Sequence, residues 1–529
     1  MTVAESYDVV IVGGGHNGLV AATYLARAGS RVLVLEKQGT VGGAAVTQEI
    51  APGFRCSTGA YMVGLLRPEV IEGLQLATRG LQFLPCEPAV VALGQDHTAL
   101  RLWTDSRKSQ SEIAAHSAKD AEMYPRFLEF LGHFAKALDP LMVRAPPDIQ
   151  SPAYNDLWFL FRRALRLRRV GTVPLQQLLR VPPMPVKDLV TEWFETELLR
   201  ASLAADALLG TFQGPWSPGT AFGLVRHLMA TADGGSWRFV RGGMGVLSDG
   251  LARAAQEAGA TVRTHTEVAR IMSSAGRVSG VETASGETIG AKIVASNADP
   301  KRTFLHLVDP AELSPEFLLQ VRNYEMNGAV ARVNLALDGA PRLAGDAEDL
   351  PPHFRIAPSL EYIERAYDDA KYGSASAEPF LDVVVPTVVD PTLAPSGKHV
   401  MSALVQYAPY NLRRGSWDKD RDKLGDRVLA LLEDYLPGLE RMVVARQVLT
   451  PADLESAFGL TEGHIYHGEM TLDQLYVLRP VPGWSQYRTP VDGLYLCGSG
   501  AHPGGGITGA PGYNAARQIL RDWPRLGRA

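Results

Sequence analysis

A glycine-rich loop near the start of the chain constrains its fold more than any other feature. Residues Gly13 to Gly18 read Gly-Gly-Gly-His-Asn-Gly and match the spacing G-x-G-x-x-G. The preceding run 8–12 has the β-branched composition of a buried parallel strand, and 19–28, closed by Gly29, has that of a helix. The three glycines permit a tight turn, close approach to a pyrophosphate, and packing of the helix on the strand. The segment therefore predicts a dinucleotide site in a doubly wound α/β domain.

A carboxylate after the next predicted strand narrows the choice of nucleotide. The strand is expected at 31–36 and ends with Glu36. A carboxylate at this place accepts hydrogen bonds from the ribose hydroxyls and repels a 2′-phosphate, which disfavours NADP. Inside the loop, we expect His16 and Asn17 to serve loop geometry and cofactor contacts.

Two further glycine-rich segments favour FAD over NAD. The pair Gly42 and Gly43 lets the chain pass the pyrophosphate a second time. Residues 494–509 read as strand, turn, glycine loop and helix, with the helix expected to begin near 506–508. Its N–H groups and positive dipole end would stabilise the negative charge that a flavin gains on hydride uptake. These features predict a flavin site and hydride transfer.

Few other side chains suggest chemistry. His502 precedes the glycines that would face the flavin and is the candidate catalytic or orienting group, with packing against the flavin edge as the alternative. His464 and His467 lack further ligands, so no metal site is expected. Cys497 is expected to be a small core residue.

Composition excludes several classes of function. The formal net charge is -5, so no global attraction to nucleic acid is expected. The three cysteines form no C-x-x-C pair, which argues against a disulfide framework, a structural zinc site and a redox dithiol. No apolar run approaches the roughly 18 residues of a membrane span, and no secretory signal is recognised. We expect a cytoplasmic protein.

The motifs also resemble a known family, the phytoene desaturase-like carotenoid and retinoid oxidoreductases. The resemblance rests on residues 13–18, 42–43, 53–59, 242–245 and 295–300. A group named for a pyridine nucleotide-disulfide oxidoreductase domain is more similar still. That closer similarity rests on residues 14–22, 42–50, 464–470, 472–476 and 494–506. Because paired cysteines are missing, disulfide chemistry does not follow from the group's name.

The resemblance implies roles for individual residues. The backbone of Val268 would contact the adenine, Glu36 and Lys37 would face the ribose, and Gly498 would approach the pyrophosphate. Other matching residues would lie along the isoalloxazine, namely Thr58, Gly59, Gly505, Gly506 and Ile507. The whole expected cofactor set is Gly13, Gly15, His16, Asn17, Gly18, Glu36, Lys37, Gly42, Gly43, Ala44, Thr58, Gly59, Val268, Asn297, Gly498, Gly505, Gly506 and Ile507.

The expected fold is α/β and has three parts. A discontinuous Rossmann-type FAD-binding domain of the glycine-pair type, as in amine oxidases and phytoene desaturases, comprises 1–75, 235–300 and 488–529. A substrate domain with a mixed β-sheet comprises 76–103 and 301–487, and a helical insertion or cap comprises 104–234. Within the substrate domain, strands are expected near 329–337, 380–385 and 399–408, and a helix near 423–435.

The predicted function is FAD-dependent oxidoreduction, desaturase- or dehydrogenase-like, of an apolar or amphipathic small molecule, with oxygen or quinone as acceptor. Polyene or lipid-like substrates follow from the resemblance alone. A flavin-dependent amine oxidase and a low-turnover flavin-binding interaction protein remain alternatives. The arginine-rich segment 157–169 is partly amphipathic. It suggests peripheral contact with an anionic membrane, a cap over the site, or a subunit contact in a homodimer.

Overall fold

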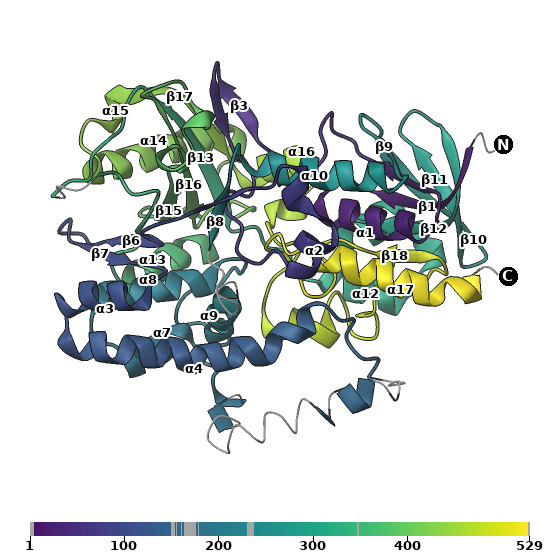
Figure 1. Cartoon of the computed structure of the whole chain (residues 1–529), viewed down its shortest axis with the longest axis horizontal. Coiled ribbons are helices and arrows are strands. Elements are labelled where there is room, and N and C mark those ends of the chain that lie inside the picture. The colour runs from purple at the N-terminus through teal and green to yellow at the C-terminus, as the bar shows by residue number, and fades with distance from the viewer. Residues whose placement is uncertain are drawn as a thin grey trace.

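Two β-sheets lie side by side and organise the molecule (Figure 1). The structure, a computed structural model, describes residues 5–149, 154, 156–159, 161–162, 176–177, 179–229, 237–345 and 349–526. Most of the arginine-rich segment 157–169 lies outside these residues, so its role stays a prediction. No helix in the described ranges is long and apolar enough to cross a membrane.

The bounds of the elements are as follows. The strands are β1 (Glu5–Val12), β2 (Val32–Leu35), β3 (Gln48–Ala51), β4 (Phe54–Cys56), β5 (Phe83–Pro85), β6 (Val90–Leu93), β7 (Ala99–Leu102), β8 (Arg238–Val240), β9 (Thr261–Arg263), β10 (Val268–Ser274), β11 (Arg277–Thr283), β12 (Thr288–Ser296), β13 (Val330–Leu337), β14 (His353–Ile356), β15 (Phe380–Val384), β16 (His399–Gln406), β17 (Val443–Leu449) and β18 (Leu494–Leu496). The helices are α1 (His16–Arg27), α2 (Pro68–Gly73), α3 (Ser106–Ala114), α4 (Ala118–Met142), α7 (Val186–Trp193), α8 (Glu197–Leu208), α9 (Thr220–Leu228), α10 (Met244–Glu257), α11 (Pro300–Arg302), α12 (Pro315–Asn323), α13 (Leu360–Lys371), α14 (Trp417–Tyr435), α15 (Leu439–Met442), α16 (Pro451–Phe458) and α17 (Ala510–Leu526).

The first sheet, at the right of Figure 1, carries the predicted βαβ unit. Its strand order is β10-β11-β12-β1-β2-β9, with β18 also paired to β12. Strands β9, β2, β1, β12 and β18 run parallel, whereas β10 and β11 are antiparallel additions. Helices α10 and α17 pack on α1. The apolar runs Val9–Val12 and Val32–Leu35 are buried because the sheet is covered.

The second sheet, at the upper left of Figure 1, has the order β17-β13-β16-β15-β14-β6-β7. Alternate residues of its strands point to opposite faces. Apolar residues of one face, such as Val333, Val383 and Val405, form a core with Leu424 and Val428 of α14. The other face carries polar side chains, which are described with the site below.

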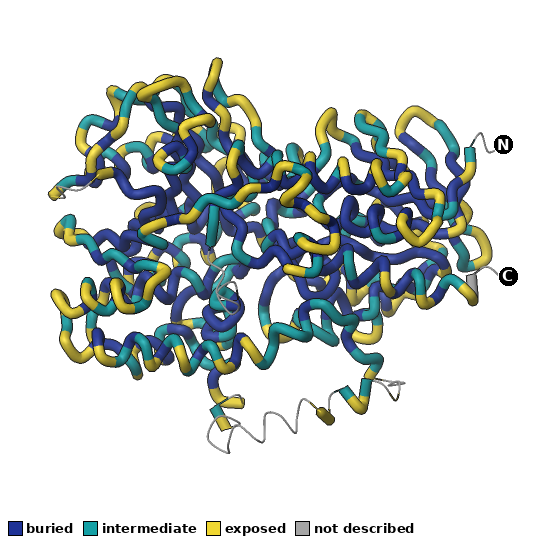
Figure 2. The backbone as a smooth tube through the Cα atoms, in the orientation of Figure 1, coloured by how far each residue is buried: buried dark blue, intermediate teal, exposed yellow. Residues whose placement is uncertain are grey.

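Helices between residues 106 and 228 pack below the second sheet (Figure 1). Their core contains edge-to-face rings, with Phe127 5.0 Å from Phe194 and 5.3 Å from Trp193 between ring centroids. The buried carboxylate of Asp120 accepts hydrogen bonds from the backbone N–H groups of Glu195 and Thr196, which fixes the start of α4 against the chain before α8. Figure 2 shows the buried backbone running through both sheets and into this layer.

Several elements differ from the sequence expectations. Strands β6, β7, β10, β14 and β17 were not expected; they are short or partly exposed, and so give weak patterns. The last helix begins at Ala510 rather than near 506–508. Gly506, Ile507 and Gly509 have φ of 103°, 56° and 69°, and this left-handed backbone cannot continue a right-handed helix.

Candidate functional site

A cavity of about 400 Å³ lies at the carboxyl ends of the parallel strands of the first sheet. Val12, Leu35 and Asn297, which end or follow β1, β2 and β12, contribute to its wall. This is where open α/β sheets bind ligands. We call it the cradle. Of the predicted cofactor set, its lining includes Gly13, Gly15, His16, Asn17, Glu36, Lys37, Gly42, Gly43, Ala44, Val268, Asn297, Gly506 and Ile507.

The glycine loop and Glu36 are held together by hydrogen bonds. The N–H of Gly14 donates to Oε2 of Glu36 over 2.8 Å, and the N–H of Gln38 donates to Oε1 over 2.9 Å. Gly13 has φ of 96°, which favours glycine. A Cβ on Gly18 would lie 2.4 Å from the carbonyl oxygen of Gly13, so the third glycine serves packing of α1.

Polar groups in the cradle lack protein partners, as expected of a site built for a polar ligand. Nε2 of His16, Oδ1 of Asn17 and Nε of Arg302 are buried with no hydrogen bond to the described residues. Burial lowers the pKa of His16 to about 3, so the ring is neutral and can donate or accept without carrying charge. The glycines and these unpartnered groups fit a dinucleotide such as FAD.

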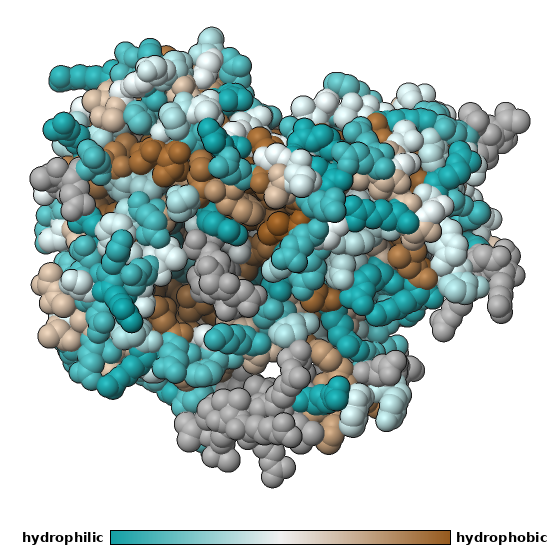
Figure 3. All heavy atoms as spheres, in the orientation of Figure 1, coloured by the Kyte–Doolittle hydropathy of each residue, from teal (hydrophilic) through white to brown (hydrophobic). Residues whose placement is uncertain are grey.

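A second cavity of about 460 Å³ opens beside the cradle. The two linings share Ala44, Leu460, Ile465, Gly506 and Ile507. We call the second cavity the chamber. Its wall is mainly apolar and comes from the face of the second sheet and from helices α4, α8 and α9. In the space-filling view, apolar side chains are visible in a recess between the two sheets (Figure 3).

Five residues of the predicted cofactor set do not line the cradle. Gly59 lines the chamber, whereas Gly18, Thr58, Gly498 and Gly505 line neither cavity. The hydroxyl of Thr58 donates to Gln48 over 2.7 Å. A Cβ on Gly498 would lie 2.4 Å from the carbonyl oxygen of Asn297, and one on Gly505 would meet the ring of Tyr466 at 2.5 Å. These two glycines therefore permit close packing of the loop.

The structure corrects the expectation for His502. Its ring lines neither cavity and is buried. Nε2 lies 2.8 Å from the carbonyl oxygen of Leu141 in α4, and the ring meets Tyr476 edge-on. Burial lowers its pKa to about 4, which leaves it neutral. His502 therefore anchors the glycine loop to α4 and is not placed to act on a substrate.

A network of buried charges forms the polar floor of the chamber. Asp382 of β15 accepts hydrogen bonds from the hydroxyl of Tyr61 (2.7 Å), Nε2 of His353 (2.9 Å) and Nε of Arg355 (2.8 Å). Arg355 also donates to Asp206 of α8 over 2.8 Å. The network therefore joins the second sheet to the helical layer that packs against it.

Mutual attraction keeps this network ionised. Burial alone would raise the pKa of Asp382, but the charges of His353 and Arg355 lower it well below its usual range. Burial opposes the charge of His353, yet Asp382 raises its pKa to about 10. The nearby His227 has its pKa lowered by burial and stays neutral. At neutral pH the floor therefore contains charged Asp382, His353 and Arg355.

Sequence reasoning missed this floor, although a signal was present. Strand β13 is apolar except for Arg332 and Asn334, which are two residues apart and therefore share a face. The register places Asn334 opposite Ser402, and Arg355 opposite Asp382. Polar residues at every second position of otherwise apolar strands indicate a buried polar face.

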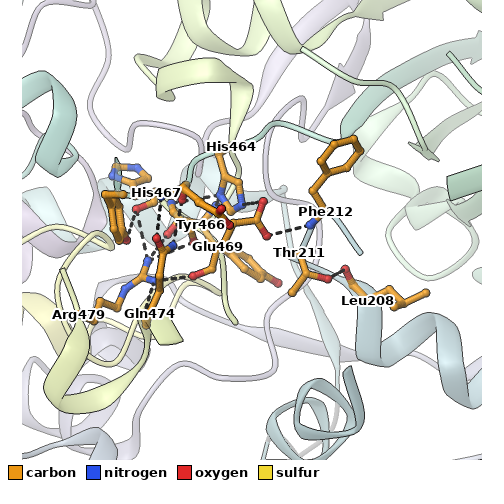
Figure 4. Close-up of polar contacts among 12 residues, drawn as sticks. Leu208, Thr211, Phe212, His464, Tyr466, His467, Glu469, Gln474 and Arg479 are labelled. Carbon is orange, nitrogen blue, oxygen red and sulfur yellow. Dashed lines mark hydrogen bonds and ion pairs between the residues drawn. The ribbon is translucent and has the colours of Figure 1, made fainter. Parts of the chain in front are cut away.

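A loop that lines both cavities is held by one buried arginine (Figure 4). Residues 465–467 of this loop contribute to the cavity walls. Arg479 is 0% exposed. Its guanidinium donates hydrogen bonds to backbone carbonyl groups of residues that come before and after it in the sequence. The acceptors are the carbonyl oxygens of Tyr466, His467, Gly468, Glu469, Gln474 and Ser499.

Replacing this arginine is expected to destabilise the protein strongly. Arg479→Met leaves several buried carbonyl groups without donors, and we expect the free energy of unfolding to fall by about 3–5 kcal/mol. Urea titration measures the loss. The control is Arg270→Met, whose exposed side chain pairs with Glu282, and it should cost below about 1 kcal/mol. Equal losses in the two variants would contradict this role.

Glu469 gives the same loop a pH-dependent stability. Oε2 accepts a hydrogen bond from the N–H of Phe212 over 2.8 Å, and Oε1 has no hydrogen-bond partner among the described residues (Figure 4). His464, 3.8 Å away, is neutral because burial lowers its pKa to about 3. Burial raises the pKa of Glu469 from 4.5 to about 8, so the carboxyl group is protonated at neutral pH.

Glu469→Gln is expected to remove this dependence. Between pH 4.5 and 8 the native protein holds one proton that the unfolded chain has lost, so wild-type stability falls as pH rises. Glutamine cannot ionise. As pH rises through this window, the free energy of unfolding of the variant should therefore increase relative to that of wild type by about 1 kcal/mol per pH unit. Urea titrations at several pH values measure the difference. A difference that is constant with pH would show that Glu469 is ionised in the native state.

Comparison with known proteins gives concordant results. The model of the family of flavin-containing amine oxidoreductases matches residues 18–520. Pyridine nucleotide-disulfide oxidoreductase domain-containing protein 2 of Rattus norvegicus is 40% identical over 543 residues, covering 98% of this chain and 94% of the relative. The lycopene-forming phytoene desaturase of Pseudescherichia vulneris is 27% identical, covering 94% and 96%. The closer and the more distant resemblance inferred from the motifs are both confirmed.

Solved structures share the fold. Wild-type putrescine oxidase bound to putrescine superposes with a TM-score of 0.60 at 17% identity, covering 98% of this chain and 99% of that one. At this identity the likeness concerns the fold alone. Cys56, Cys86 and Cys497 are buried and free, so a disulfide reaction of the kind named in the rat relative has no counterpart among them.

Proposed function

The chain belongs to the family of flavin-containing amine oxidoreductases, and we propose that it is an FAD-dependent oxidoreductase that transfers hydride between FAD and an apolar or amphipathic small molecule. One observation carries the proposal. The cradle and the chamber meet at Ala44, Gly506 and Ile507, so a cofactor in one would face a ligand in the other.

The cofactor would be held by the residues of the cradle. The glycine loop and the start of α1 would receive the pyrophosphate, Glu36 the ribose, and the backbone near Val268 the adenine. Bound FAD supplies the acceptor for a hydride from carbon, and this chemistry belongs to the cofactor. The protein would orient the substrate and exclude water.

The chamber favours a substrate that is largely apolar. Leu203, Leu209, Leu224, Phe380 and Leu404 are part of its wall, and such walls bind by removing apolar surface from water. The phytoene desaturase among the relatives is named for lycopene formation. A polyene or lipid-like substrate is therefore the proposal for this chain, with oxygen or quinone as the electron acceptor.

An amine oxidase is the second candidate because the family and the fold include amine oxidases. A buried substrate ammonium is stabilised by an unpaired carboxylate close to it. Asp206 and Asp382 are the acids of the described chamber wall, and both are engaged by Arg355. The charge distribution therefore favours a neutral or anionic substrate over an ammonium.

Anaerobic reduction of the bound flavin tests the proposal. The FAD-loaded protein would be mixed with polyenes, long-chain acids and alcohols, and with putrescine and benzylamine, and the flavin absorbance followed. We expect an apolar or amphipathic compound to bleach the flavin, and both amines to leave it oxidised. Bleaching by an amine, with aldehyde and peroxide formed in air, would establish the amine oxidase. If dithionite alone bleaches the flavin, a low-turnover interaction protein is favoured.

A further inference from the structure

Arg332 is a buried cation in the wall of the chamber, and the network described above does not account for it. It lies in the middle of β13 and is 2% exposed. Its Nη2 donates to the hydroxyl of Ser402 over 2.6 Å and to the carbonyl of Ser57 over 3.5 Å. Nε and Nη1 are buried and have no hydrogen-bond partner among the described residues.

The surroundings of Arg332 do not neutralise its charge. Its guanidinium carbon lies 4.2 Å from the centroid of the Tyr61 ring, and the hydroxyl of that tyrosine is committed to Asp382. The two acids of the described wall, Asp206 and Asp382, face the two cations Arg355 and His353. One positive charge is therefore left over. A buried arginine stays ionised, so this surplus persists at every physiological pH.

A neighbouring strand adds a second unpartnered donor. Gln406 of β16 lines the chamber, is 1% exposed, and its Nε2 has no hydrogen-bond partner in the described part of the chain. The register places Gln406 opposite Val330, two residues from Arg332 on the same face. Buried donors of this kind are normally satisfied, and these ones line a chamber that a ligand could enter. The remaining wall is mainly apolar.

We propose that the chamber binds an amphipathic acid, with its carboxylate on Arg332 and its apolar chain along the rest of the wall. A single surplus charge matches one carboxylate, and a charge-assisted hydrogen bond is stronger than a neutral one. The inference rests on the proposed function, since it names the substrate class of the same site. Arg332 is thus a specificity-determining residue that holds the substrate by its head group.

Binding of decanoate and 1-decanol to the FAD-loaded protein tests the proposal without requiring turnover. The two probes have the same alkyl chain and differ only in the head group. Calorimetry and flavin absorbance measure their affinities. We expect wild type to bind decanoate roughly tenfold or more tightly than decanol. Arg332→Gln should lose the preference for decanoate and keep its affinity for decanol. Arg332→Lys should retain part of the preference, and the surface variant Arg270→Gln should match wild type.

Each other outcome overturns the inference. Equal affinity of wild type for acid and alcohol, or no binding of either probe, would show that no acid site exists, even if Arg332→Gln fails to fold. An unchanged preference in Arg332→Gln would place the acid elsewhere. A loss of FAD or a shifted flavin spectrum in Arg332→Gln, without change in the preference, would make Arg332 a flavin contact. Failure of the purified chain to bind FAD at all would instead remove the proposed function.

Discussion

Gly15→Val is expected to fold and to bind FAD at least about 100-fold more weakly than wild type, a loss of about 2.7 kcal/mol in binding free energy. Gly15 precedes α1 with φ of -67°, which any residue can adopt, so the substitution does not strain the backbone. A Cβ there would lie 2.6 Å from Nδ2 of Asn297, the end of a side chain that can turn aside. The valine would then occupy space that the pyrophosphate needs.

The matched control for this prediction is Gly132→Ala. Gly132 lies within α4, and a Cβ added there meets nothing within 4 Å. FAD affinity should be unchanged, and the free energy of unfolding should rise by about 0.5–1 kcal/mol because alanine favours the helix. Fluorescence titration of the apoproteins with FAD measures both affinities. Wild-type FAD affinity in Gly15→Val would show that the pyrophosphate does not pass this glycine.

Asp382→Asn is expected to lower the free energy of unfolding by about 3–5 kcal/mol, because it leaves buried His353 and Arg355 without the carboxylate that compensates them. The exposed pair of Lys398 with Asp338 provides the control. Asp338→Asn should cost below about 1 kcal/mol, since solvent screens that pair. Urea titration compares the two variants. A loss in Asp382→Asn as small as in the control would show that the floor is not held by charge.

The loss in Asp382→Asn should also depend on pH. The lowered pKa of Asp382 contributes stability above about pH 4, and that contribution disappears as pH falls. The raised pKa of His353 contributes stability below its ordinary value of 6.5, and that contribution is lost as pH rises toward about 10. The difference between wild type and variant should therefore be largest between about pH 4 and 6.5 and shrink on either side.

Much of the cradle could be predicted from sequence because its signals are local. The loop from Gly13 to Gly18 needs a strand before it and a helix after it, and β1 (Glu5–Val12) and α1 (His16–Arg27) supply them. Glu36 follows β2 directly, where a ribose contact belongs. Short-range geometry of this kind requires no knowledge of how distant segments pack.

The chamber could not be predicted in the same way. Its charged residues come from separate strands, and only the register of the sheet brings Arg355 opposite Asp382. For His502 the local sequence was misleading. The residue precedes glycines that were expected to face the flavin, but in the folded chain its ring lies against the carbonyl oxygen of Leu141. The position of a residue in the sequence shows which loop carries it, but the tertiary packing determines where its side chain points.

The crystal structure of the FAD-loaded protein would show whether the flavin lies between the cradle and the chamber. We expect the pyrophosphate to lie on the glycine loop at Gly13 and Gly15, and the isoalloxazine to reach the junction at Ala44, Gly506 and Ile507 with one face open to the chamber. An isoalloxazine that lies elsewhere, or that the wall separates from the chamber, would contradict this expectation.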